Sequence, residues 1–201
     1  MSMASEVLEH FGGYPAFSYR DVYLFMKGMY NDAGYAKDLI HALHKKKKIY
    51  AIRRGFYTTH KDESVAGYAF RPFYYGLTAA LMIRELSGQQ THMEIITPNR
   101  IDSTEIVVFN DERFKVFAHH IAKKHFFGFE SISYSGFALP VSDPEKTLID
   151  LVYFQKKLPR QEYSELLSSV NTGKLRRYLA YYDRPTKRAV MNLVKLRSSK
   201  R

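Results

Sequence analysis

The sequence predicts an α+β protein in which residues 1–60 form a winged helix-turn-helix and residues 61–201 form an antiparallel-sheet domain with C-terminal helices. The first domain is indicated by the order of its segments, because residues 18–59 read as helix, turn, helix and hairpin. The second is indicated by short strand-like runs between turn signals from residue 93 to residue 141, after which helical spacing takes over.

The two helices of the first domain are expected from capping and spacing. The first should begin at Ser18, because Ser18 and Asp21 form a variant of the capping box, and apolar residues then recur at helical spacing. Residues 31–34 supply turn-forming side chains. The second helix follows, and four of its residues form one apolar stripe: Ala36, Leu39, Ile40 and Leu43.

The face of the second helix opposite this stripe is polar and mostly cationic. Such a helix can dock on its neighbours through the stripe and offer hydrogen-bond donors to phosphates and base edges in the DNA major groove. The lysines at 45–48 also suit a solvated helix C-terminus, which is the alternative. The candidate DNA-binding residues of this segment are Tyr35, Lys37, Asp38, His41, His44, Lys45 and Lys48.

A β-hairpin is expected directly after the second helix. Residues 49–52 and 56–59 are rich in β-branched and aromatic side chains, and Gly55 between them can take a positive φ in a tight turn. Arg53 and Arg54 stand at the expected tip, where they can reach phosphates or a narrow minor groove. Both are candidate DNA-binding residues, although Arg-Arg-Gly is also an ordinary hairpin turn and winged helices also bind proteins.

The second domain is expected to mix a small sheet with helices. A connector with a short helix at 61–67 and a buried helix at 73–86 come first. Short connections favour antiparallel neighbours among the strands expected at 93–97, 105–109, 113–118, 125–132 and 137–141. Asp143 as N-cap and Pro144 as first helical residue should open the next helix. Further helices are expected at 161–170, 173–182 and 185–196.

The charge of the chain favours a nucleic-acid partner. Its 201 residues include 31 Lys and Arg against 20 Asp and Glu, a net charge of +11. Residues 155–201 alone hold 13 basic and 3 acidic side chains. We expect this basic tail to add a second, sequence-independent DNA contact, with an acidic toxin surface or plain solubility as alternatives. Its candidate residues are Arg176, Arg177, Arg184, Lys187 and Arg188.

The composition also restricts the compartment and the chemistry. The chain has no cysteine, which excludes disulfides, thiolate metal sites and a cysteine nucleophile, and which agrees with a reducing compartment. It has neither a signal peptide nor an apolar run of about 18 residues, so no membrane partner is expected. The expected location is the cytoplasm.

No catalytic residue, metal or cofactor is expected. Glu145, Lys146 and Asp150 lie on one helix, where they favour ion pairing on the helix surface or a cap. The histidines at 119, 120 and 125 are expected in the core or on the surface, because adjacent histidines on a strand point to opposite faces and cannot easily share one ion. The chain also lacks a glycine-rich phosphate loop.

A metal-dependent nuclease that is delivered to nucleic acid by the winged helix is the alternative function. Four acidic residues could form its metal site, but they flank expected turns, where acids are common. The segment 111–115 also lacks the Glu-x-Lys spacing that such nucleases use. These acidic residues are Asp102, Glu105, Asp111 and Glu112.

Four segments carry a resemblance to a known family. They are residues 43–57, the helix around 75–81, Phe126-Phe127-Gly128, and above all residues 141–150. In this order they resemble the AbiEi-type antitoxins and related transcriptional regulators of type IV, abortive-infection toxin–antitoxin systems. The resemblance implies an N-terminal winged helix that binds inverted repeats in its own promoter and a C-terminal domain associated with antitoxicity. It also implies a nucleotidyltransferase-like toxin as a possible partner.

The function expected from these observations is sequence-specific DNA binding rather than catalysis. The chain should act as a transcriptional repressor that binds operator DNA, and the resemblance implies an antitoxin that regulates its own toxin–antitoxin operon. Inverted repeats in the operator require two copies of the chain, either as a dimer or as monomers that bind cooperatively.

Overall fold

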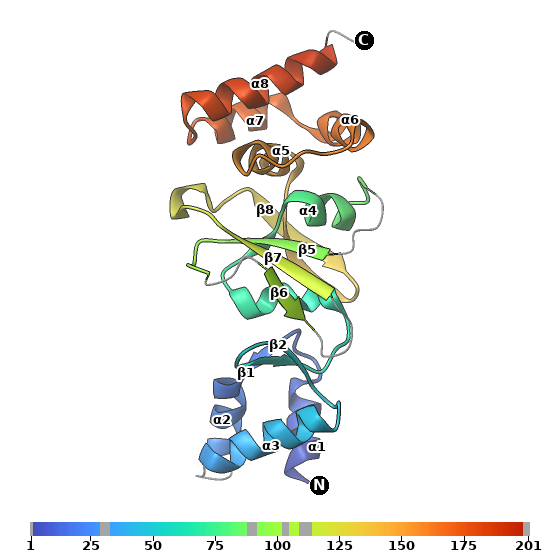
Figure 1. The fold of residues 1–201 in the computed structure, drawn as a ribbon, viewed down its shortest axis with the longest axis vertical. Coiled ribbons are helices and arrows are strands. Elements are labelled where there is room, and N and C mark those ends of the chain that lie inside the picture. The colour runs from blue at the N-terminus through green and yellow to red at the C-terminus, as the bar shows by residue number, and fades with distance from the viewer. Residues whose placement is uncertain (1, 29–32, 88–91, 102–104, 109–113, 199–201) are drawn as a thin grey trace. The chain divides into compact units, whose positions relative to one another are not determined.

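The computed structural model of the chain describes residues 2–28, 33–87, 92–101, 105–108 and 114–198 (Figure 1). Its helices are α1 (Met3–Phe11), α2 (Tyr19–Lys27), α3 (Ala33–Lys45), α4 (Leu77–Ile83), α5 (Pro144–Tyr153), α6 (Arg160–Ser169), α7 (Thr172–Leu179) and α8 (Arg184–Ser198), with 3-10 helices η1 (Glu63–Phe70) and η2 (Lys123–His125). Its strands are β1 (Phe17–Ser18), β2 (Tyr50–Arg53), β3 (Phe56–Thr58), β4 (Tyr74–Tyr75), β5 (His92–Thr97), β6 (Glu105–Val108), β7 (Phe114–His120), β8 (Phe129–Tyr134) and β9 (Phe137–Ser142). The predicted α+β class is confirmed.

The strands form two sheets. The first has the order β1-β3-β2 and antiparallel pairs, and the second has the order β6-β7-β5-β4-β9-β8. In the second sheet β8 pairs antiparallel with β9, as expected, and β4, which was not expected as a strand, pairs antiparallel with β5. However, β4 and β9 run parallel. The long stretch of chain between these two strands permits a parallel crossover, so this sheet is mixed rather than purely antiparallel.

Internal contacts divide the chain into two units. The first comprises Met1–Arg71 and Glu105–Val116, and the second comprises Pro72–Thr104 and Phe117–Arg201. Helix η1 belongs to the first unit, because it packs against β2 and β3. A boundary between separate domains at residue 60 stays a prediction.

The first unit contains the predicted helices and hairpin. Ser18 caps α2 as expected, since its hydroxyl accepts the amide of Asp21 at 3.2 Å while the Asp21 carboxylate accepts the amide of Ser18 at 2.6 Å. Helix α3 covers the expected second helix, and β2 and β3 form the hairpin. Gly55 has φ +79° in the turn between them. Local capping and turn chemistry therefore specify this segment.

Helix α1 is an addition to the expected elements. Ser2 caps it by accepting the amide of Ser5, and Met3, Val7 and Phe11 recur every four residues and are buried. These three side chains join the apolar core that also holds residues from α2 and α3. The helix has nine residues, so its spacing signal is short and easily missed.

In the second unit, the helix expected at 73–86 divides into strand β4 and helix α4. Tyr74 and Tyr75 pair with β5, and the helix begins only at Leu77. Gly76 permits this close approach, because a Cβ at that position would lie 2.5 Å from Cδ1 of Ile96. The strand interrupts an apolar run that is otherwise typical of a buried helix.

The strand expected at 125–132 also begins later than predicted. His125 ends η2, and β8 begins at Phe129. Gly128 before it has φ +75°, and a Cβ there would lie 2.9 Å from Cβ of Lys146. A left-handed glycine that touches helix α5 therefore sets the start of this strand.

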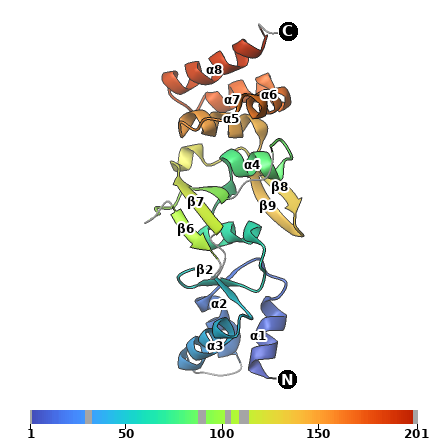
Figure 2. The same cartoon turned by 45° about the vertical axis from the view of Figure 1, so that its right-hand side comes forward.

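The helices after the sheet are those expected. Asp143 is the N-cap of α5, its carboxylate accepts the amide of Lys146 at 2.8 Å, and Pro144 occupies the first turn. Figure 2 shows the layers of the second unit: the sheet, then α4 and α5, then α6, α7 and α8. The apolar core of this unit lies between these layers and includes Leu148, Leu175 and Val190.

Candidate nucleic-acid interface

Helix α3 separates an apolar face from a cationic one. All four residues of its expected stripe are buried: Ala36, Leu39, Ile40 and Leu43. Lys37, His41 and Lys45 are exposed, and their spacing of four residues places them along one side of the helix. Tyr35 and Asp38 are exposed beside them. The structure thus brings together most of the candidate residues of this segment.

His44 departs from the expected outward face. It is half-buried, and its ring lies edge-on to Tyr57 with 6.4 Å between the ring centroids. The side chain therefore contributes to packing between α3 and β3. The exposed candidate DNA-binding residues of α3 are therefore fewer than predicted, because His44 is not among them.

The lysine run closes helix α3. The amide of Lys48 donates to the carbonyl of Leu43 at 2.9 Å and that of Lys47 donates to the carbonyl of His44 at 2.9 Å, which is the Schellman arrangement. Lys47 has φ +54°, a conformation in which glycine is common. Lys48 is exposed. These lysines suit the helix dipole, and their side chains still face solvent.

The two hairpin arginines differ in their surroundings. The guanidinium of Arg53 lies 4.8 Å from the ring centroid of Phe56 and 4.8 Å from that of Phe70. Arg54 is exposed at the turn. Both arginines are exposed, as expected, but Arg53 also stacks on two aromatic rings of the first unit. The contact with Phe70 joins the hairpin to η1, a link that local sequence does not reveal.

Arg53→Ala is expected to reduce stability, and Arg54→Ala is not. Loss of the two ring contacts should cost about 1 kcal/mol, which lowers Tm by a few degrees in a protein of this size. The measurement is thermal unfolding of both variants beside the wild type, followed by circular dichroism. Equal melting temperatures for the two variants would show that the stacked position of Arg53 contributes nothing to stability.

The candidate residues of the basic tail lie on α7 and α8. Arg176, Arg177, Arg184 and Arg188 are exposed. Lys187 is half-buried, and its ammonium donates to the carbonyl of Ala180 at 3.4 Å. The tail therefore presents exposed arginines, while one of its candidate cations already has a contact within the chain.

The ion pair expected on the surface of α5 is instead fully buried. Lys146 and Asp150 both have 0% exposed side chains and form a salt bridge. The hydroxyl of Tyr74 donates to Asp150 at 2.9 Å, and the Lys146 ammonium lies within 5.8 Å of the ring centroids of Tyr74, Phe127 and Tyr182. Burial lowers the pKa of Lys146 and raises the pKa of Asp150. The four-residue spacing of Lys146 and Asp150 shows that they meet on one face of α5. It does not show that this face is turned toward the core.

The two acidic residues at the start of α5, Asp143 and Glu145, also form hydrogen bonds and ion pairs. Glu145 is buried, accepts the amide of Asn171 at 2.6 Å and pairs with Lys174 at 3.3 Å. Lys174 also pairs with Asp143 at 3.0 Å. The hydroxyl of Tyr178 donates to Asp143 at 2.8 Å, and burial together with this carboxylate raises the pKa of Tyr178 to about 12. This cluster fastens α7 to the start of α5.

The expected histidines lie in separate environments. His119 contacts Glu94 at 3.3 Å, His120 is exposed, and the ring of His125 stacks on Tyr182 with 4.1 Å between centroids. Across the described residues, no three His, Asp or Glu side chains gather closely enough to hold a metal ion. Asp102, Asp111, Glu112 and the side chain of Glu105 lie outside the described part of the chain. In that described part, no helix is long and apolar enough to cross a membrane.

The fold has a counterpart among solved structures. It is similar to the RV2827C protein from Mycobacterium tuberculosis, with a TM-score of 0.62 and 13% sequence identity. The alignment covers 96% of this chain and 76% of that chain. No protein-family model and no curated protein matches the sequence. At this identity the likeness concerns the fold alone.

Proposed function

We propose that the protein is a sequence-specific DNA-binding transcriptional regulator whose first 60 residues act as a winged helix-turn-helix. In this proposal α3 is the recognition helix and the β2–β3 hairpin is the wing. The order of α2, α3, β2 and β3 supports it, as does the docking of α3 through a continuous apolar stripe. The observation that carries the proposal is the exposed side of α3, where Lys37, His41 and Lys45 are aligned.

The residues of this interface divide into two roles. Those in the first half of a recognition helix reach base edges, so Tyr35, Lys37, Asp38 and His41 are the candidates for reading sequence. Cations further along the chain are placed for phosphates, which fix the register of the protein on the duplex. These are Lys45, Lys48 and Arg54; Arg53 is also exposed, and its guanidinium stacks on Phe56 and Phe70.

The test is the double variant Lys37→Gln/Lys45→Gln. Its affinity for the DNA upstream of its own coding sequence should fall, and log K should depend less steeply on log salt, by about one unit for each lost phosphate contact. The measurement is fluorescence anisotropy at several salt concentrations. Lys123→Gln/Lys124→Gln removes the same charge from the exposed side of η2 and is the matched control. An unchanged salt slope in the α3 variant would contradict the assignment.

We extend the proposal to an antitoxin that acts in the cytoplasm and represses its own toxin–antitoxin operon. The resemblance of residues 141–150 and the other three segments to AbiEi-type antitoxins supports this extension. Its test is coexpression with the neighbouring gene. A nucleotidyltransferase-like neighbour that stops growth alone, and permits growth beside this chain, is the expected result. A neighbour without toxicity would remove the antitoxin role and leave the DNA-binding role intact.

A further inference from the structure

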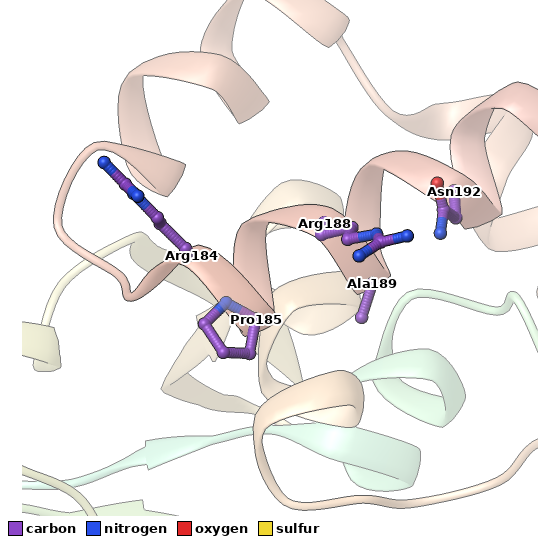
Figure 3. Close-up of a pocket in the computed structure, with 5 residues that line it drawn as sticks. All are labelled: Arg184, Pro185, Arg188, Ala189 and Asn192. Carbon is purple, nitrogen blue, oxygen red and sulfur yellow. The ribbon is translucent and has the colours of Figure 1, made fainter.

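The exposed face of α8 carries charge of one sign. Arg184, Arg188 and Lys195 are exposed at spacings of four and seven residues, which places them on one side of the helix. We call these three residues the α8 stripe. The exposed residues between them are uncharged, as Figure 3 shows in part: Pro185, Ala189 and Asn192.

The opposite face of α8 fixes the direction of the stripe. Val190 is fully buried, and Leu193 and Val194 are half-buried against the core of the second unit. These residues dock α8 on α5 and α6. Because the apolar face sets the rotation of the helix, the cations of the stripe project into solvent.

Acidic side chains do not neutralise the two arginines. Helix α8 contains no Asp or Glu, and the nearest acid before it, Asp183, accepts the amide of Thr186 at 3.0 Å. Within the described ranges, neither Arg184 nor Arg188 forms an ion pair. Their guanidinium donors are thus available to an anionic partner.

We propose that the α8 stripe binds the phosphate backbone of double-stranded DNA and gives affinity that does not depend on sequence. This inference rests on the proposed function and assigns a separate task to the second unit. The stripe is about 16 Å long at 1.5 Å per residue. Over that length one DNA strand presents about five phosphates. Contacts of this kind position a protein on the duplex without reading bases.

The surroundings of the stripe favour DNA over a protein partner. Protein interfaces depend on buried aromatic or large apolar anchors. Among the described side chains of α8, none is large, apolar and exposed; the nearest such residue in the sequence, Tyr181, lies in the turn before α8, is 61% exposed and packs on Phe127 with 5.2 Å between ring centroids. Arg184, Pro185, Arg188, Ala189 and Asn192 line an open hollow of about 630 Å³ (Figure 3), which leaves room for a backbone to approach the two arginines.

The test compares Arg184→Gln/Arg188→Gln with Lys123→Gln/Lys124→Gln, a control that removes the same charge from exposed positions on η2, outside the basic tail. The probes are the duplex upstream of the coding sequence and a random-sequence duplex of equal length. Raising the salt from about 50 to 200 mM should weaken binding by the wild type and, less strongly, by the α8 variant. The factor should be about ten times larger for the wild type, because the variant has two fewer phosphate contacts to lose. Arg188→Gln alone should reduce this difference to about threefold, because one phosphate contact is lost, and the control should follow the wild type.

Both duplexes should lose affinity by the same factor in the α8 variants, so the preference for the upstream duplex should not change. A salt slope equal to that of the control would overturn the inference and would leave the α3 proposal standing. A loss of preference without a change in slope would also overturn it, since α8 would then read sequence. If the wild type bound neither duplex, the proposed function and this inference would both fail.

Discussion

Replacing Lys146 by Met is expected to lower the free energy of unfolding by about 3–5 kcal/mol, because the change leaves a buried carboxylate without its counter-ion. Asp150 has no exposed surface, and the hydroxyl of Tyr74, which donates to it at 2.9 Å, cannot balance its charge. Asp150→Leu should cost a comparable amount, since it strands a buried ammonium among aromatic rings.

The double variant Lys146→Met/Asp150→Leu should recover most of the loss, because it removes both charges and keeps apolar volume in the core. Urea unfolding monitored by circular dichroism would give the four free energies of the double-mutant cycle. The exposed pair Gln161 and Glu165 on α6, joined at 3.1 Å with the same four-residue spacing, is the control. Alanine substitutions there should each change stability by less than about 0.5 kcal/mol. Independent, additive costs at Lys146 and Asp150 would argue against a coupled pair.

This pair illustrates where sequence patterns stop being sufficient. The spacing of Lys146 and Asp150 predicts correctly that they meet on one side of a helix. Whether that side faces water depends on Tyr74, which lies 76 residues before Asp150 in the chain. Periodicity around these charges did not indicate burial, because buried charges are rare and a surface pair is the ordinary expectation.

The elements that were predicted well are those with local causes. Ser18 caps α2, Asp143 and Pro144 open α5, and Gly55 takes the positive φ required by the hairpin. Each of these interactions involves residues close together in sequence, so the signal is complete within a short window. The starts of α2 and α5 follow directly from it.

The elements that were missed depend on distant partners. Strand β4 exists because Gly76 lets Tyr74 and Tyr75 approach β5, and its two residues carry no periodicity of their own. At the candidate interface, the cationic side of α3 was predictable from spacing. The stacking of Arg53 on Phe70 was not, because the hairpin and η1 meet only in the folded chain.

Glu94→Gln is expected to remove most of the acid sensitivity of the second unit. Burial alone would raise the pKa of Glu94, but contacts with His119, Thr78 and Lys156 outweigh it and lower the pKa to about 2. The side chain is 2% exposed, its carboxylate accepts the hydroxyl of Thr78 at 2.6 Å, and Lys156 pairs with it at 2.9 Å. The ionised form is thus strongly favoured by the folded state.

The sign of the effect follows from the direction of this shift. A carboxyl whose pKa is lower in the folded state stabilises the protein above its ordinary pKa of 4.5, and that stability is lost as the pH falls toward about 2. A difference of this size corresponds to about 3 kcal/mol. The free energy of unfolding of the wild type should therefore fall steeply between about pH 5 and pH 2, whereas Glu94→Gln should begin lower and change less.

Urea unfolding at pH 5, 4 and 3 would measure both curves. Glu130→Gln is the matched control, since Glu130 also forms a salt bridge, with Arg84 at 2.8 Å, but its side chain is 60% exposed. That variant should keep the wild-type dependence on pH, because an exposed pair is screened by solvent and contributes little. Parallel curves for the wild type and Glu94→Gln would mean that another buried carboxyl governs the acid sensitivity. If the free energy of unfolding depends less on pH in Glu94→Gln, but not in Glu130→Gln, the acid sensitivity arises from the contacts that Thr78, His119 and Lys156 make with Glu94.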